Sequence, residues 1–163
     1  RSFSLYSRHH QLTPNNVVVF NRGLHVHDAN IMKQEVRYFF DEYLKLPETH
    51  QPMLIWRETS PQHFDTPNGY GDKSVRQIPC HRYSNLTFSY VEDFQNRLVD
   101  QMFTYYRHVP IMRVWNVSSI AAHQHIHLQN RIDKAGCYDC AHFCENSGVY
   151  YYWREIFSNI LPL

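Results

Sequence analysis

Three short apolar runs, separated by stretches with helical spacing, constrain the fold of this chain more than any other feature. The runs cover residues 17–20, 53–56 and 111–115, and turn residues bound each of them. Apolar runs this short are typical of buried strands. Their alternation with helices predicts an α/β fold in which the three strands are parallel neighbours joined by right-handed crossovers.

Amphipathic helices are expected in the intervals between these runs. Residues 30–46 carry apolar side chains at helical spacing, with Asp28 or Asn30 as the N-cap and Pro47 just past the end. Residues 91–106 repeat the apolar stripe. Since an N-cap and a following proline mark the ends of a helix, the first of these helices is the better bounded.

The remaining segments are expected to complete one domain over residues 1–163. A last helix is predicted over 149–161, whereas residues 58–89 contain Pro and Gly and no clean period. The second interval predicts a long excursion after the second strand, and loops of that length are usually functional or disordered. With 163 residues, 43% of them hydrophobic, the chain suits a single globular core.

Charge and hydropathy exclude several classes of protein. The 16 Lys and Arg against 15 Asp and Glu leave a formal charge of +1, and no basic run occurs. Binding to nucleic acid or to an anionic membrane needs a concentrated basic face, so neither partner is expected. No stretch approaches the roughly 18 apolar residues of a membrane span. Because the chain begins at Arg1 without a signal-peptide pattern, we expect an amino-terminal part to be processed away or to lie outside this sequence.

The four cysteines leave a zinc site and disulfides open. Cys137, Cys140 and Cys144 lie within eight positions, and Cys80 lies far upstream. Zinc fingers and ribbons need a second ligand pair at matching spacing, which this cluster lacks. In an oxidising compartment Cys80 would close a long loop onto Cys137 or Cys140, of which we favour Cys137. Cys144 would then pair with the missing amino-terminal part, or two members of the cluster would pair with each other.

Two N-glycosylation sequons support the disulfide interpretation. They begin at Asn85 and Asn116, and neither has proline in the middle position. Together with the 12 histidines and the 15% aromatic residues, they favour a glycan-facing protein of the secretory pathway, in the Golgi lumen or outside the cell.

Polar side chains follow the predicted strands, at the edge where open parallel sheets bind ligands. Asn21 follows the first run, Arg57 and His63 follow the second, and Asn116 follows the third. Asn21 would either donate to an oxyanion or form a strand-end turn. Arg57 and His63 would either bind substrate or hold the long loop through hydrogen bonds to backbone carbonyls.

The most specific signal is Asp139-Cys140-Ala141-His142, which places a carboxylate three residues before an imidazole. Such a pair lets the carboxylate accept from one ring nitrogen, so that the other can act as general base toward a serine. Taken alone, the same pattern is also common in a surface turn with a helix cap.

Two further patterns have a structural and a functional interpretation each. His123, His125 and His127 alternate as if on one face of a strand and could suit a metal, but no carboxylate accompanies them at matching spacing. We therefore expect a solvated, glycan-facing loop there, and neither a metal nor another cofactor in the protein. The aromatic run 150–153 is interpreted as helix packing in preference to sugar stacking.

Four segments resemble the carboxyl-terminal half of the PC-esterase family, which includes the trichome-birefringence-like polysaccharide O-acetyltransferases of plants. They are 17–23 (VVVFNRG), 55–64 (IWRETSPQHF), 114–119 (VWNVSS) and 139–144 (DCAHFC). The family is similar in fold to the SGNH/GDSL hydrolases. The resemblance implies a three-layer αβα fold with a parallel sheet, incomplete at its amino-terminal side, and a Ser-His-Asp triad whose acid and base are Asp139 and His142. It also implies O-acetyl transfer to a glycan, or hydrolysis of its esters.

The sequence departs from the family at two places. The family's serine lies in a G-D-S motif, for which Gly71-Asp72-Lys73-Ser74 is only a near match, and its proline-glycine run after the D-x-x-H segment is replaced by residues 145–148. We therefore expect the serine on the missing amino-terminal segment or on another subunit, with a glycan or acetylated polysaccharide as substrate. The alternatives are a non-catalytic glycan-binding or structural glycoprotein subunit with an esterase-like scaffold, and a zinc-organised binding module.

Overall fold

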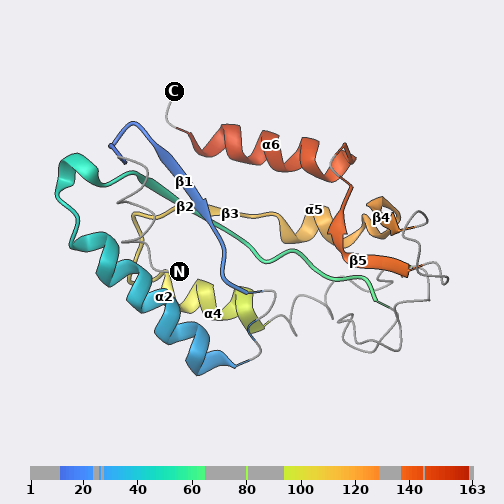
Figure 1. Ribbon diagram of the computed structural model, residues 1–163, viewed down its shortest axis with the longest axis horizontal. Helices are drawn as coiled ribbons and strands as arrows, with labels where there is room; N and C mark the ends of the chain where they lie inside the picture. The colour runs from blue at the N-terminus through green and yellow to red at the C-terminus, as the bar shows by residue number, and fades with distance from the viewer. Residues whose placement is uncertain are drawn as a thin grey trace. The chain divides into compact units, whose positions relative to one another are not determined.

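A computed structural model of the chain describes residues 12–23, 26, 28–64, 80, 94–128, 137–144 and 146–161. The chain forms two compact units. Unit 1 is drawn from Arg1–Thr59 and Phe94–Ile111, and unit 2 from Ser60–Asp93 and Met112–Leu163. The elements of both units are labelled in Figure 1. The expectation of a single domain stays a prediction.

Three parallel strands in the order β1-β2-β3 form one sheet of the described residues. They are β1 (Val17–Phe20), β2 (Met53–Arg57) and β3 (Ile111–Met112). Strand β1 pairs with β2 in register from Val17 opposite Met53 to Phe20 opposite Trp56. The backbone N–H of Trp56 donates to the Pro110 carbonyl at 3.0 Å, next to the start of β3. The predicted α/β class and the parallel order of the three runs are therefore confirmed.

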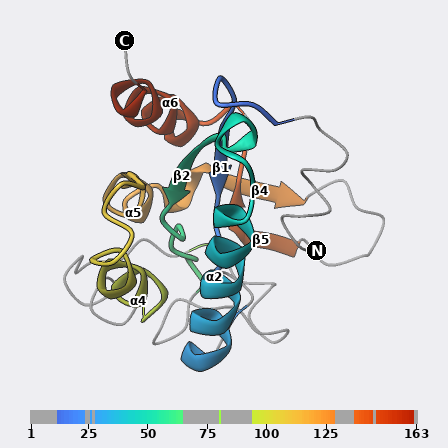
Figure 2. The same cartoon turned by 90° about the vertical axis from the view of Figure 1, so that its left-hand side faces the viewer.

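Two helices of unit 1 cover the same face of β1 and β2. Helix α2 (Ala29–Leu44) joins β1 to β2, and α4 (Phe94–Met102) lies between β2 and β3 in the chain. Because consecutive strands are neighbours in the sheet, right-handed crossovers place both helices on one side, as Figures 1 and 2 show. The core joins side chains of both helices and of β2, among them Met32, Val36, Phe40, Leu54, Trp56, Leu98, Val99 and Met102.

Helix α2 begins where the sequence places its cap. The side chain of Asp28 accepts hydrogen bonds from the N–H groups of Asn30, at 2.7 Å, and Ile31, at 3.0 Å. Asp28 itself has an extended backbone, as an N-cap residue requires. Of the two predicted caps, Asp28 is therefore the one the chain uses.

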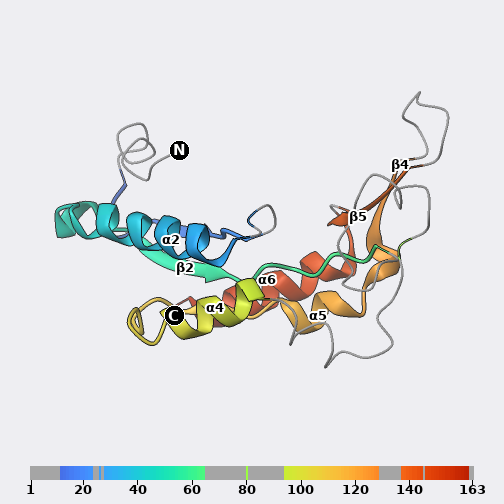
Figure 3. The same cartoon turned by 90° about the horizontal axis from the view of Figure 1, so that it is seen from below.

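Unit 2 contains a β-hairpin between helical segments. Strands β4 (His125–Leu128) and β5 (Cys137–Phe143) pair antiparallel and lie side by side in Figures 2 and 3. Helices α5 (Trp115–Ser119) and α6 (Gly148–Ile160) flank them in the chain. The short helix η2 (Ala122–Gln124) leads into β4. A small core joins Ala121, Phe143, Val149 and Trp153.

The predicted third strand is too long, and the reason lies in its second half. Strand β3 ends at Met112, and Trp115 begins α5. The N–H and the hydroxyl of Ser118 both donate to the Val114 carbonyl, at 3.2 Å and 2.6 Å, which closes a helical turn. That local bond occupies a carbonyl that a longer strand would offer to β2. The predicted final helix is confirmed as α6.

Candidate functional site

The Asp139–His142 segment lies in a wide bulge of β5. Along β4 the register moves one residue, from Ile126 to His125, while along β5 the partner moves four residues, from Asp139 to Phe143. Residues three apart in a regular strand point to opposite faces. The extra residues of the bulge remove this alternation and bring the two side chains together.

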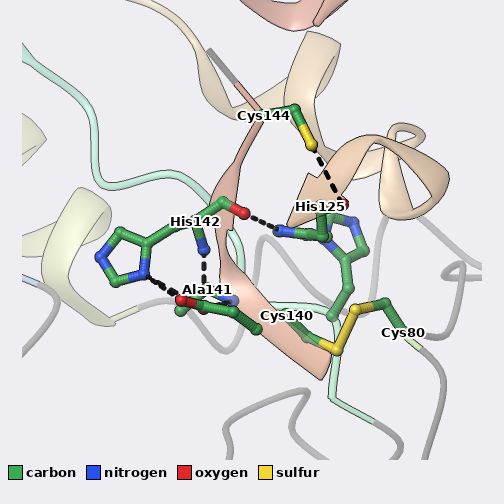
Figure 4. Close-up of a disulfide and its surroundings, with 8 residues drawn as sticks. Cys80, His125, Cys140, Ala141, His142 and Cys144 are labelled. Atoms are coloured by element: carbon green, nitrogen blue, oxygen red, sulfur yellow. Dashed lines mark hydrogen bonds and ion pairs between the residues drawn. A yellow bond between two sulfur atoms is a disulfide. The ribbon is translucent and has the colours of Figure 1, made fainter. Parts of the chain in front are cut away.

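The carboxylate of Asp139 organises the bulge and binds the imidazole. Its Oδ1 accepts the N–H groups of Ala141 and His142, both at 3.1 Å. The Nδ1 of His142 lies 2.9 Å from Oδ2 and 3.1 Å from Oδ1. Figure 4 marks the contacts of His142 with dashed lines. Since a carboxylate only accepts, Nδ1 is the nitrogen that carries the hydrogen, and in the neutral ring Nε2 keeps its lone pair. The predicted hydrogen bond between Asp139 and His142 is confirmed.

The side chain of His142 lies at the surface of unit 2. The side chain is 60% exposed, and within the described part of the chain no residue forms a hydrogen bond with Nε2. The Asp139 side chain is more enclosed, at 26% exposed. An exposed base backed by a half-buried carboxylate can take a proton from a hydroxyl that approaches from solvent. The catalytic role of both residues stays a prediction.

A disulfide anchors the middle of the bulge. Cys140 is fully buried and bonded to Cys80, with the two Cα atoms 5.3 Å apart. The predicted bridge from Cys80 to this cluster is confirmed, but the preference for Cys137 is wrong. Because a strand rises about 3.3 Å per residue, Cys137 lies roughly 10 Å further along β5. The bulge places Cys140, and not Cys137, at bonding distance from Cys80.

His125 holds the other side of the bulge. It is buried at the start of β4, and its Nδ1 donates to the His142 carbonyl at 2.9 Å. Its ring stacks on Phe143, with centroids 4.2 Å apart. The expectation of a solvated loop is wrong for His125, because these contacts bury it. His123 is exposed and lies in η2, so the two do not share a strand face, and the side chain of His127 lies outside the described residues.

The ring of His63 contacts the ring of His125. His63 is fully buried. Its backbone N–H donates to the Cys140 carbonyl at 2.9 Å, and its ring Nε2 donates to the Ser119 carbonyl at 2.8 Å. Its Nδ1 lies 2.7 Å from Nε2 of His125. These contacts match the alternative in which His63 holds the loop through backbone carbonyls.

The electrostatics of His125 follow from its surroundings. Burial lowers the pKa of His125, while its hydrogen bond to the His142 carbonyl and the charge of Asp139 oppose that shift. The charged form of the ring is therefore disfavoured by desolvation.

In unit 1, Asn21 and Arg57 meet at the ends of β1 and β2. The Asn21 side-chain amide donates to the Arg57 carbonyl at 2.8 Å and to Oγ1 of Thr59 at 3.1 Å. An amide has two N–H groups, so both have acceptors within the protein, as the strand-end alternative implies. Binding of a substrate by Asn21 or Arg57 stays a prediction.

Two buried side-chain amides lie at this strand end that were not predicted from the sequence. Asn96 accepts from the Thr59 N–H and donates to the Thr59 carbonyl, both at 2.9 Å. Gln95 donates to the carbonyls of Gly23, at 3.2 Å, and Val26, at 3.0 Å. The only signal is that two polar residues interrupt the apolar stripe of α4.

The remaining candidate residues divide between described and undescribed segments. Asn116 is exposed in the first turn of α5, where a glycan could be attached, and Cys144 is exposed with a free thiol. Asn85, the Gly71–Ser74 near match and Glu145 lie outside the described residues. The partner of Cys144 stays a prediction.

The aromatic residues 150–153 of α6 include one that packs against the protein and three that are exposed. Trp153 is half-buried, donates to the Ser118 hydroxyl at 2.9 Å and contacts Phe143 edge-on, as predicted for helix packing. In contrast, Tyr150, Tyr151 and Tyr152 are 39%, 55% and 57% exposed.

Among the described residues no three His, Cys, Asp or Glu side chains gather as metal ligands would. The helices within the described ranges are all too short or too polar to traverse a bilayer. The disulfide is compatible with a secreted protein.

No family model, no curated protein and no solved structure matches the chain.

Proposed function

We propose that this chain supplies the acid and base of a Ser-His-Asp triad in a glycan O-acetyltransferase or acetyl esterase of the SGNH type. The observation that carries the proposal is the pair in the β5 bulge: Oδ2 of Asp139 faces Nδ1 of His142, and the His142 side chain is 60% exposed. The serine would come from a segment outside this sequence or from another subunit, in agreement with the resemblance to the PC-esterases.

The proposed reaction uses each nitrogen of His142 once. The serine hydroxyl attacks the acetyl carbonyl of the donor, and Nε2 takes its proton, while Asp139 stabilises the imidazolium that forms. The tetrahedral intermediate then expels the donor's alcohol, which takes the proton from Nε2 and leaves an acetyl-serine. A sugar hydroxyl in a transferase, or water in an esterase, attacks this ester with the same base.

The surroundings of the pair support a large substrate. A triad buried in a narrow pocket suits small esters, whereas His142 is 60% exposed on the surface of unit 2. Access from solvent suits an acetyl group carried on a polymer. The exposed Asn116 sequon and the Cys80–Cys140 disulfide are compatible with the compartments where glycans are modified.

The test is hydrolysis of para-nitrophenyl acetate by the full-length gene product that contains this chain. His142→Ala is expected to lower kcat by about 10⁴-fold or more, since the members of a triad act as a unit. The matched control is His123→Ala, which removes an exposed histidine of the same unit that lacks a carboxylate partner among the described residues. Equal rates for the wild type and His142→Ala would overturn the proposal, and so would a full-length product without a serine nucleophile.

A second candidate function is glycan binding without turnover, and the exposed tyrosines of α6 favour it. Tyr151 and Tyr152 are both more than half exposed, and the Arg154 guanidinium lies 5.5 Å from the ring centre of Tyr151. Exposed rings offer flat apolar faces against which sugars can stack. If this function holds, Tyr151→Ala and Tyr152→Ala weaken the retardation of the protein in gels containing acetylated xylan, while His142→Ala has no effect on binding or turnover.

A further inference from the structure

We infer that His125 is a positioning residue for His142, held in place by a proton that it shares with His63. The inference rests on the proposed function only in taking His142 as the base. The His63–His125 pair itself stands on its contacts in unit 2.

The hydrogen inventory of the pair requires three N–H groups on two rings. Nδ1 of His125 faces the His142 carbonyl, and Nε2 of His63 faces the Ser119 carbonyl. A carbonyl oxygen only accepts, so both of these nitrogens carry hydrogen. If both rings were neutral, the two remaining nitrogens would face each other with lone pairs at 2.7 Å. One further proton between Nδ1 of His63 and Nε2 of His125 turns this repulsion into a hydrogen bond.

The pair therefore carries one positive charge and excludes a second. With one shared proton every ring N–H of the pair has an acceptor, which offsets the burial of the charge. A second proton would set two N–H groups against each other in a site that already disfavours charge on His125. The pair then titrates as a unit and not as two separate histidines.

Titratable groups of the described residues lie near the pair on β5, beside it at Cys144, and in η2. On β5, Asp139 favours and His142 disfavours charge on His125. The Cys144 thiol lies 3.4 Å from the His125 carbonyl, and His123 of η2 is exposed two residues before His125. From α5 the contact is the uncharged Ser119 carbonyl.

The pair fixes the backbone of His142 on the side opposite Asp139. The N–H of His142 donates to Asp139, and its carbonyl accepts from His125. Figure 4 shows the His142 ring on one side of β5 and His125 with the disulfide on the other. Both backbone groups of the proposed base are thus held, so its ring direction depends on His125. A shift of about 1 Å in such a group can cost roughly 100-fold in rate.

The first experiment compares substitutions that keep or remove the bond to the His142 carbonyl. His125→Phe keeps the stack on Phe143 but loses the donor, whereas His125→Asn retains an amide N–H close to the position of Nδ1. In the full-length product we expect kcat for para-nitrophenyl acetate to fall about 10- to 100-fold in His125→Phe with little change in KM, and to recover in part in His125→Asn. His123→Phe is the matched control and is expected to leave kcat unchanged. Equal kcat in wild type and His125→Phe would overturn the positioning role.

The second experiment reads the proton directly and needs no turnover. In the chain labelled with ¹⁵N-histidine, NMR at neutral pH is expected to show hydrogen on Nδ1 of His125 and on Nε2 of His63, with a third proton coupled to both rings. His63→Gln, which keeps a donor for the Ser119 carbonyl, is expected to abolish the third signal. A ring nitrogen without hydrogen at either carbonyl, or two neutral rings, would overturn the shared proton.

The same spectra separate this inference from the proposed function. In His125→Phe the Nδ1–H tautomer of His142 is expected to lose population, because its backbone is released. If this change occurs in a protein without esterase activity in any variant, the proposed function fails while the positioning role stands. If the His142 tautomer is unchanged in a folded His125→Phe chain, the positioning role fails whatever the activity.

Discussion

At the scale of single residues, Asp139 combines two functions that substitution can separate. Oδ1 accepts two backbone N–H groups of the bulge, and Oδ2 faces the His142 ring. Asp139→Asn keeps an oxygen for the backbone but loses the carboxylate, so kcat is expected to fall about 10⁴-fold with little loss of stability. Asp139→Ala is expected to lower the free energy of unfolding by a further 1–2 kcal/mol or so, since both N–H groups lose their acceptor. Urea unfolding at the same midpoint for both variants would show that the side chain does not hold the bulge.

Because His125 is buried, we expect the protein to lose stability in mild acid. Burial lowers the pKa of His125, and the pair that it forms with His63 excludes a second proton, so below the ordinary histidine pKa of about 6.5 the unfolded chain binds a proton that the folded pair does not. The stability linked to this second proton is fully present above about pH 6.5 and is lost as the pH falls through the lowered pKa of the folded state. The urea midpoint is therefore expected to decline as the pH falls below about 6.5, and less so in His125→Phe. The same decline in both proteins would assign the effect to other groups.

At the scale of secondary structure, the N-cap of α2 gives a prediction of known size. Asp28 accepts from two N–H groups of the first turn that have no acceptor within the helix. Asp28→Ala is expected to lower the free energy of unfolding by about 1 kcal/mol, and Asp28→Asn to be near neutral because asparagine caps equally well. Equal losses for the two variants would mean that the charge, and not the cap, is responsible.

The elements that sequence predicted well are those whose signal is local. The run 17–20 is apolar throughout and became β1, and α2 has both a cap and a regular stripe. The hairpin of β4 and β5 was not predicted, since β4 begins with a histidine that is buried against His63 and Phe143. Such burial depends on partners that are distant in sequence, and no local pattern reports them.

The candidate site shows the same division. The Asp139–His142 pair could be predicted because both residues lie in one short segment. The choice of Cys140 over Cys137 depends on the bulge, which exists only through the register of the hairpin. The contact of His63 with His125 joins residues 62 positions apart. The sequence indicated His63 as a candidate site residue but did not indicate His125 as its contact.

At the scale of the whole molecule, the disulfide joins two segments of unit 2 that are distant in sequence. It closes a loop with a sequence separation of 60, which in the chain-entropy model stabilises the folded state by about 4 kcal/mol. Cys80→Ser with Cys140→Ala is expected to lower the free energy of unfolding by at least this amount, measured in urea under oxidising conditions. The control Cys144→Ser, at an exposed free thiol, is expected to change it by less than about 0.5 kcal/mol. A reduced wild type as stable as the oxidised one would contradict the assignment.

The central claim is that His142, backed by Asp139, activates a serine toward acyl transfer. A fluorophosphonate reagent forms a covalent bond with a serine that a neighbouring base activates. Mass spectrometry of the labelled full-length product, compared with His142→Ala, therefore tests the claim directly. We predict one phosphonylated serine in the wild type and in His123→Ala, and none in His142→Ala at equal folded protein. A serine labelled equally in His142→Ala, or a wild type that takes up no label, would contradict the account.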